Sequence, residues 1–393
     1  MTAFSEAHAP GAPSATGGIP LAVPNIGPAE RAAVLEAVES GFVSSVGPAV
    51  EAFEREFAEV VGSTYAVACA SGTAALHVAL RLLGVGAGDE VLCSDFTFIG
   101  SSNPIAYLGA RATLVDSETR TWNMDPQLVA DEFARRRRMG APMPKAVELV
   151  HVLGQPADAA SILEICADHD VPVIEDAAES LGATWSSGTL TGRSTGAVGR
   201  IGCFSFNGNK IATSGGGGMI VTDDEALARR AKHLTTQAKV PDVGYLHDDV
   251  GYNYRLTNLS AALGLAQVRR LDEFVASKRS TAAAYDAAFA DLALTRPPRI
   301  EGFDSTYWLY SVLVPEGRDR DVFLQHLTAA GVGARALWRP LHAQPPLRDA
   351  DRLGGQVADA LFDRGVSLPC SSTITPAEIE RVTDAVQSFF TVS

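Results

Sequence analysis

The sequence has few of the features expected of a secreted, membrane-spanning or metal-binding protein. Its five cysteines are odd in number and scattered, and no two form a C-x-x-C pair, which argues against a disulfide framework and a cysteine-based zinc or redox site. No run of about 18 apolar residues could cross a bilayer. No basic segment leads into an apolar stretch at the N-terminus. These absences predict a cytoplasmic protein.

The sequence also has fewer basic than acidic residues. The 393 residues carry 46 acidic and 32 basic side chains, giving a net charge of −14. Proteins that bind nucleic acid or anionic membrane surfaces neutralise phosphates with Lys and Arg, so we expect neither partner. One dense basic run, Arg135–Arg138, ends a predicted helix, and we interpret it as a solvated face that complements the helix dipole.

Several common catalytic motifs are missing or misplaced. The sequence contains no G-x-x-x-x-G-K-[ST] phosphate loop and no G-x-G-x-x-G that opens a helix. Gly192–Gly196 matches the G-x-S-x-G pattern of hydrolases but lies among turn residues, not between a strand and a helix. Cys166 and His169 lack two further ligands for zinc, so no metal site is expected.

The chain does have a regular alternation of short apolar runs and helical stretches from residue 65 onward. The apolar runs are Tyr65–Ala70, Glu90–Ser94, Ala112–Asp116, Ala146–Val152, Val171–Glu175, Ile201–Phe206 and Gly218–Thr222. Apolar runs without polar alternation are buried on both faces, so they predict an α/β fold with a mostly parallel sheet covered by helices. We expect a flexible tail over residues 1–18, a large domain over 19–270 and a smaller α+β domain over 271–393.

Polar residues follow three of the predicted strands. Ser71-Gly72-Thr73 opens a helix, whose N-terminal N–H groups can hold a phosphate, although such residues often only cap a helix. Asp176 ends another strand, where it could hold a positive charge or cap the next segment. Lys210 follows a third apolar run, and lysine amines form Schiff bases with carbonyl compounds, including the aldehyde of pyridoxal phosphate.

These clusters, together with further motifs, resemble one known family. In chain order the matching residues are Gly47-Pro48, Ser71-Gly72-Thr73-Ala74-Ala75-Leu76, Asp95-Phe96-Thr97-Phe98, Glu175-Asp176-Ala177-Ala178, Ser205-Phe206 with Lys210, Gly216-Gly217-Gly218, Tyr252-Asn253-Tyr254-Arg255 and Pro340-Leu341-His342. Over residues 19–390 the sequence resembles the DegT/DnrJ/EryC1/StrS sugar aminotransferases. This implies the aspartate-aminotransferase-like fold (PLP fold type I) and pyridoxal 5′-phosphate as cofactor.

The resemblance also implies roles for the residues around the cofactor ring. Lys210 would hold the cofactor covalently and later move protons during the reaction. Asp176 would pair with the pyridine nitrogen and keep the ring protonated, which makes it a better electron sink. Phe98 would stack on the ring, the alternative being simple core packing.

Further residues are implied at the edges of the same site. Gly72, Thr73 and Ser205 would hold the cofactor phosphate through N–H groups and hydroxyls. Asn253 would reach the phosphate in the neighbouring subunit, so a homodimer with shared active sites is implied. Glu179, where the family more often has glutamine, would touch the ring hydroxyl.

For the reaction, the resemblance implies transfer of an amino group from L-glutamate to a nucleotide-linked 4-keto-6-deoxyhexose. The stretches Phe206–Lys210 and Gln155-Pro156 look most like the branch that aminates carbon 4. By the same analogy, Arg335, Trp338 and His342 are candidates for contacting the nucleotide diphosphate, although Arg335 and Trp338 could equally be structural.

Three alternatives remain open at this point. Amination at carbon 3 of a 3-keto sugar is compatible with both Lys210 and Asp176. A dehydratase or deoxygenase using the same cofactor is less consistent, because such relatives carry histidine in place of Lys210. A silent regulatory protein would have no chemical need for Lys210, Asp176 and Ser205 together. The sequence leaves the nucleotide, the other sugar substituents and the product configuration undetermined.

Overall fold

The computed structural model describes residues 17–241 and 243–391. The predicted tail, residues 1–18, therefore lies almost entirely outside the described residues. None of the described helices is both long and apolar enough to span a bilayer.

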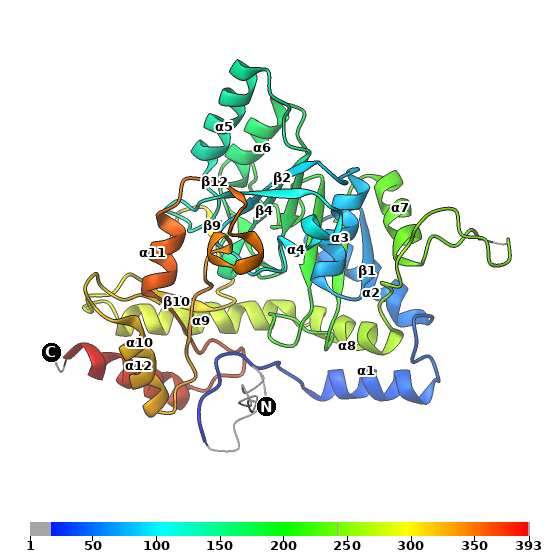
Figure 1. Cartoon of the computed structure of the whole chain (residues 1–393). Coiled ribbons are helices and arrows are strands. Elements are labelled where there is room, and N and C mark those ends of the chain that lie inside the picture. The colour runs from blue at the N-terminus through cyan, green and yellow to red at the C-terminus, as the bar shows by residue number, and fades with distance from the viewer. Residues whose placement is uncertain (1–16, 242, 392–393) are drawn as a thin grey trace, which may run out of the picture.

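An eight-stranded sheet forms the centre of the molecule (Figure 1), with the strand order β1-β8-β7-β5-β4-β2-β3-β12. Its strands are β1 (Tyr65–Cys69), β2 (Glu90–Ser94), β3 (Arg111–Val115), β4 (Ala146–Val150), β5 (Val173–Asp176), β7 (Ile201–Ser205), β8 (Gly218–Thr222) and β12 (Asp351–Leu353). All neighbours are parallel except β8, which runs antiparallel to β1 and β7. Every expected apolar run forms a strand, and the mostly parallel sheet is confirmed.

Helices cover both faces of this sheet (Figure 1). Those from the first two-thirds of the chain are α1 (Pro28–Glu39), α2 (Pro48–Val61), α3 (Gly72–Leu82), α4 (Asn103–Tyr107), α5 (Pro126–Met139), α6 (Ala159–Ala167), α7 (Glu225–Thr235) and α8 (Asn258–Val268). Helix α3 packs with α4 and α7 on one face, and α2, α5, α6 and α8 pack on the other. Burial on both faces explains why these strands are mostly apolar, although β4 and β5 also carry the buried Glu148 and Glu175.

The C-terminal part forms a smaller α+β unit. Its elements are α9 (Leu271–Ala288), β10 (Tyr310–Leu313), α10 (Arg320–Ala329), β11 (Arg335–Ala336), α11 (Val357–Arg364), β13 (Gly365–Leu368) and α12 (Pro376–Thr391), and the pair β6 (Thr184–Trp185) and β9 (Phe303–Asp304) joins it to the large part. Strands β10, β13 and β11 form an antiparallel sheet.

Two connections cross the predicted domain boundaries. Ile19 forms a bridge with Val332 and is buried in the C-terminal apolar cluster. Strand β12 leaves the C-terminal part and pairs with β3 at the edge of the large sheet. The N-terminal residue Ile19 therefore packs in the C-terminal part, and the C-terminal strand β12 belongs to the large sheet. This pairing of β12 places the segment after residue 336 against the large sheet.

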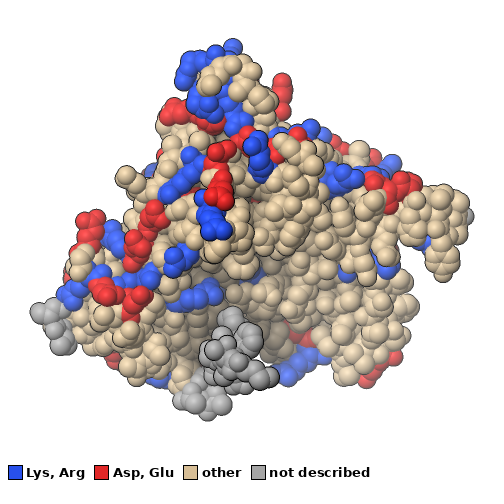
Figure 2. Space-filling model, viewed as in Figure 1, with Lys and Arg blue, Asp and Glu red and all other residues tan. Residues whose placement is uncertain are grey.

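One residue of the arginine run at the end of α5 does not lie on the solvated face that the sequence predicts. Figure 2 shows Lys and Arg side chains gathered at the end of the molecule where Figure 1 places α5. Arg136, however, is buried and pairs with Glu132 at 2.7 Å and with Glu90 on β2. The solvated-face prediction is wrong for Arg136, because its side chain ties the helix to the sheet.

Candidate active site

A cavity of about 520 Å³ opens at the carboxyl ends of the central strands. Nine of the sequence-predicted site residues line it: Gly72, Thr73, Phe98, Asp176, Glu179, Ser205, Lys210, Arg335 and Trp338. Since parallel strands end at a common edge, residues that follow different strands converge there. The cavity is thus built by the large sheet on one side and by the segment around β11 on the other.

One end of the cavity is the N-terminus of α3. The Ser71 side chain accepts a hydrogen bond from the Ala74 N–H at 3.0 Å and so caps the helix. The Gly72 backbone lies so close to β7 that a Cβ atom there would be 2.8 Å from the Ser205 Cβ. First-turn N–H groups have no acceptor within the helix, so this end suits a phosphate without any Lys or Arg.

The cavity floor carries the carboxylate of Asp176, which is 5% exposed. Its Oδ2 accepts a hydrogen bond from Ser101 Oγ at 2.8 Å, and its Oδ1 accepts one from the Ala178 N–H at 3.1 Å. Ser101 Oγ is in turn 2.9 Å from Thr97 Oγ1. Burial raises the pKa of Asp176, while these hydrogen bonds oppose the shift. The carboxylate is fixed in orientation and buried, which favours a cationic partner beside it.

Lys210 projects into the same cavity. Its Nζ lies 3.3 Å from Glu179 Oε1 and 3.9 Å from the centroid of the Trp308 ring. Glu179 Oε2 accepts a hydrogen bond from the Leu153 N–H at 2.9 Å, which fixes the carboxylate. Burial raises the pKa of Glu179, and the positive charge of Lys210 opposes this. The amine is thus held between a carboxylate and an indole face.

Phe98 is 57% exposed although it is a large apolar ring. It lines the cavity, so the alternative of core packing does not hold for this residue. Trp308 and Trp338 form a second aromatic surface, stacked at 6.0 Å with an interplanar angle of 11°. Flat rings on separate walls suit planar ligand groups.

Two predicted site residues lie outside the cavity lining. Asn253 is exposed and forms an isolated bridge with Thr236, so within one chain it does not line the cavity. His342 is tied to two carboxylates, with Nδ1 2.6 Å from Asp95 Oδ2 and Nε2 3.1 Å from Asp359 Oδ1. Both of its ring nitrogens are thereby engaged, and the structure does not bring His342 to the cavity with Arg335 and Trp338.

The sequence reasoning missed Ser101 and Trp308. Ser101 lies in an irregular turn after β2, and no motif distinguishes it from other serines. Trp308 is almost 100 residues from Lys210, and only the packing of the C-terminal part onto the large sheet places its ring there. Its indole N–H also donates to the Asn209 carbonyl at 2.7 Å, next to Lys210.

A sequence profile of the DegT/DnrJ/EryC1/StrS aminotransferase family matches residues 24–387. The chain belongs to this family. It is 41% identical to EpsN of Bacillus subtilis (strain 168), named as a pyridoxal phosphate-dependent aminotransferase, with 94% of this chain and 95% of EpsN covered. It is also 38% identical to the GDP-perosamine synthase of Caulobacter vibrioides, with 94% and 97% covered.

Solved structures agree with this assignment. The crystal structure of the aminotransferase TlmJ from Streptoalloteichus hindustanus matches with a TM-score of 0.85 at 31% identity, covering 94% of this chain and 98% of that one. The protein is therefore a sugar aminotransferase with the aspartate-aminotransferase-like fold, and pyridoxal phosphate is its cofactor.

The cavity fits this cofactor. The α3 N-terminus suits its phosphate, the oriented Asp176 carboxylate suits a protonated pyridine nitrogen, and the Lys210 amine suits its aldehyde. Because Gly72 has no Cβ, the N-terminus of α3 packs directly against Ser205, so both lie at the same end of the cavity. Among residues 17–241 and 243–391 no group of His, Cys, Asp or Glu could hold a metal ion.

A buried carboxyl group in the large sheet, that of Glu148, is expected to make the stability of the protein depend on pH. Glu148 on β4 is fully buried, two residues before Val150, which pairs with Asp176. Within the described part of the chain its Oε2 has no hydrogen-bond partner, and its Oε1 lies 4.0 Å from Cys93 Sγ. Burial, reinforced by the charge of Asp176, raises the pKa of Glu148 well above its usual value. Both effects favour the protonated form of Glu148 in the folded protein.

Replacing Glu148 by glutamine should remove a pH dependence of stability. Above about pH 4.3 the unfolded chain releases this proton and the folded chain keeps it, so wild-type unfolding free energy falls by about 1.4 kcal/mol per pH unit from this group. Glu148→Gln has no such proton. Its stability relative to wild type, measured by urea denaturation, is expected to rise from about pH 5 to pH 7. A difference that does not change with pH would contradict the protonated state.

Proposed function

We propose that this enzyme transfers the amino group of L-glutamate to carbon 4 of a nucleotide-linked 4-keto-6-deoxyhexose. The observation that carries the proposal is the meeting of the Lys210 amine, the Asp176 carboxylate and the α3 N-terminus in one cavity. That cavity has a second wall, with a guanidinium and two indoles, beyond what the cofactor alone needs. A relative with 38% identity, GDP-perosamine synthase, supports a nucleotide sugar as the acceptor.

The chemistry divides between the cofactor and the chain. When bound, pyridoxal phosphate supplies an electron sink for the carbon that carries the amino nitrogen. Asp176 would keep the ring nitrogen protonated, and Lys210 Nζ would accept a proton from one carbon and return it to another. Glu179 Oε1, at 3.3 Å, orients the amine, while Phe98, which lines the cavity, would pack on the cofactor ring.

The second wall suits the acceptor. Arg335 lines the cavity, where its charged neighbour is Glu179, and its guanidinium makes no hydrogen bond or ion pair with any described residue. An arginine in this state can bind a diphosphate or a carboxylate in a bidentate manner. The half-buried Trp338 ring provides a flat apolar surface for a sugar or base, and the buried Trp308 ring stacks on it and supports it. We therefore keep Arg335 and Trp338 as the proposed substrate-binding residues.

The direct test is a substrate panel. Purified holoenzyme is incubated with L-glutamate and with 4-keto and 3-keto sugars linked to GDP, UDP or dTDP, and the products are identified by mass and NMR. We expect an amine at carbon 4. Amination at carbon 3 would replace the carbon-4 assignment, and the absence of any aminated sugar would refute the proposal. L-aspartate and L-alanine in place of glutamate test the donor.

The proposed homodimer places Asn253 at the cofactor phosphate of the other subunit. If so, Asn253→Ala and Lys210→Ala subunits complement each other, because a mixed dimer contains one site with both wild-type residues. Mixing equal amounts of the two inactive variants should restore about a quarter of wild-type activity, given random exchange in a twofold dimer. Lys210→Ala mixed with Asp176→Asn is the control, since both residues line one chain's cavity. The control should stay inactive, and no restoration in the Asn253→Ala and Lys210→Ala mixture would contradict sharing through Asn253.

A further inference from the structure

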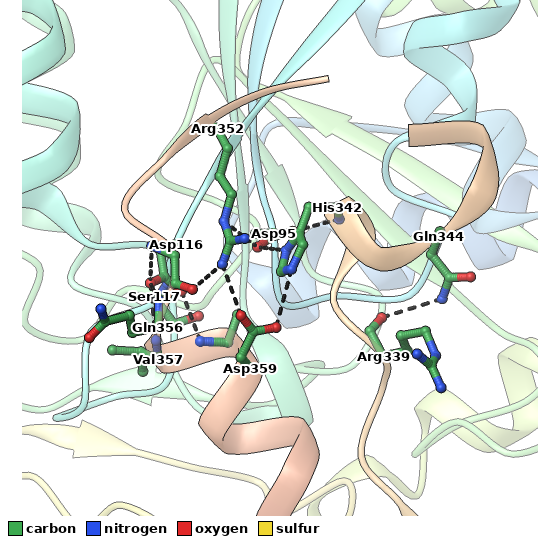
Figure 3. A network of polar contacts seen from close by, with 12 residues as sticks. Asp95, Asp116, Ser117, Arg339, His342, Gln344, Arg352, Gln356, Val357 and Asp359 are labelled. Atoms are coloured by element: carbon green, nitrogen blue, oxygen red, sulfur yellow. Dashed lines mark hydrogen bonds and ion pairs between the residues drawn. The ribbon is translucent and has the colours of Figure 1, made fainter. Parts of the chain in front are cut away.

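A polar network joins the C-terminal part to the edge of the large sheet (Figure 3). Its centre is Asp95, which follows β2 and is fully buried. The Asp95 carbonyl accepts a hydrogen bond from the Leu341 N–H at 2.8 Å, and its Oδ1 accepts one from the His342 N–H at 2.9 Å. Its Oδ2 lies 2.6 Å from His342 Nδ1. One residue at the end of β2 thus binds two consecutive residues of the C-terminal part.

The network continues to α11. His342 Nε2 and Arg352 Nη2 each lie 3.1 Å from the Asp359 carboxylate (Figure 3). Asp116, which follows β3, accepts hydrogen bonds from four consecutive N–H groups before and within the first turn of α11, at 2.7 to 3.1 Å, from residues 355–358. Carboxylates at the ends of β2 and β3 therefore fix both ends of the segment 341–358.

This anchorage lies directly beside the cavity. Leu337 and Trp338, a few residues before His342, line the cavity wall. The Trp338 ring contacts Phe96, the residue after Asp95, with 5.7 Å between ring centroids. On the other side of Phe96 the chain continues into Thr97 and Phe98, which also line the cavity. Asp95 is thus located where the cofactor side and the proposed acceptor side of the cavity meet.

We infer that Asp95 is a positioning residue that acts through His342 to hold the Leu337-Trp338 wall in place for the acceptor sugar nucleotide. This inference rests on the proposed function, in which that wall binds the acceptor. It assigns His342 to the support of the wall and not to contact with the nucleotide. Burial raises the pKa of Asp95, and the contacts from His342 and Arg352 oppose this. Without these partners a buried carboxylate would be costly.

Asp95→Asn tests the inference. Asparagine can still accept the hydrogen bond from the His342 backbone N–H, but its amide nitrogen cannot accept one from His342 Nδ1. The loss of one charge-assisted hydrogen bond should raise the KM for the nucleotide sugar about tenfold. The rate of the glutamate half-reaction and kcat should stay within about twofold, because the cofactor side of the cavity keeps its contacts.

Two measurements do not depend on turnover. Hydrogen exchange of the peptide spanning 337–347 should become faster in Asp95→Asn, and the affinity of the holoenzyme for GDP, UDP or dTDP should fall about tenfold. Should Asp95→Asn fail to fold, His342→Gln, which keeps the backbone hydrogen bond to Asp95, is expected to show the same changes. Because exchange is independent of the acceptor, it tests the anchorage even if the substrate panel fails.

The matched control is Glu90→Gln. Glu90 is at the opposite end of β2, where it pairs with Arg136, away from the cavity. The Glu90→Gln substitution should lower the free energy of unfolding. It should leave the KM for the nucleotide sugar and the hydrogen exchange of residues 337–347 unchanged. Equal effects in both variants would indicate a general loss of stability and overturn the inference. So would unchanged exchange and KM in Asp95→Asn, or a loss confined to the glutamate half-reaction.

Discussion

Replacing Lys210 by alanine is expected to abolish amino transfer, with a loss of at least about 10⁴-fold in kcat. The substitution removes both the amine that would bind the cofactor covalently and the group that would move protons. In the structure this amine is held between Glu179 and the Trp308 ring. No other lysine lines the cavity in the part of the chain that the structure describes.

The measurement combines kinetics with chemical trapping. Borohydride reduction of the wild-type holoenzyme should fix the cofactor on the peptide that contains Lys210, and Lys210→Ala should carry no such label. Lys232→Ala, a surface lysine paired with Glu54, serves as the control and should keep full activity and the Lys210 label. A label on a different lysine of the wild-type enzyme would disprove the role of Lys210.

The second large effect is expected from Asp176→Asn, which should lower kcat by about 10³-fold while the protein stays folded. Asparagine keeps the shape and can still accept from Ser101, but it removes the charge that would hold the ring nitrogen protonated. The electron sink is weakened, and the loss therefore falls on proton removal more than on the binding of either substrate.

Steady-state kinetics and the primary isotope effect with α-deuterated glutamate measure this loss. The isotope effect should increase in Asp176→Asn, because proton removal becomes more fully rate-limiting. Asp125→Asn is a suitable control, since Asp125 is the N-cap of α5 and asparagine caps a helix equally well. Full activity in Asp176→Asn would show that the carboxylate does not pair with the ring nitrogen.

Much of the large sheet could be predicted because its strands are buried on both faces. Such strands are largely apolar, and all seven expected runs form strands in the structure. Strand β12 was missed because Asp351-Arg352-Leu353 has no apolar pattern. Its place in the sheet depends on pairing with β3 and on the anchorage by Asp95 and Asp116.

In the candidate site, too, some residues could be predicted from local sequence patterns and others depend on tertiary contacts. Residues that follow parallel strands could be predicted to meet, and Asp176, Ser205 and Lys210 do line one cavity. His342 could not be placed, since its neighbours Asp95 and Asp359 are 247 residues before it and 17 after it. Ser101 and Trp308 belong to no pattern, and only the folded chain brings them to Asp176 and Lys210.

By itself, the sequence determined the layered α/β architecture and the carboxyl-end location of the site. These features follow from local patterns, namely apolar runs, strand ends and a helix N-terminus, whereas pyridoxal phosphate and the residue roles were implied by the resemblance to the aminotransferase family. Only the tertiary structure decided how the acceptor wall is held, because it is built from segments far apart in the chain. Their contacts depend on packing and on buried charge pairs, which no local pattern encodes.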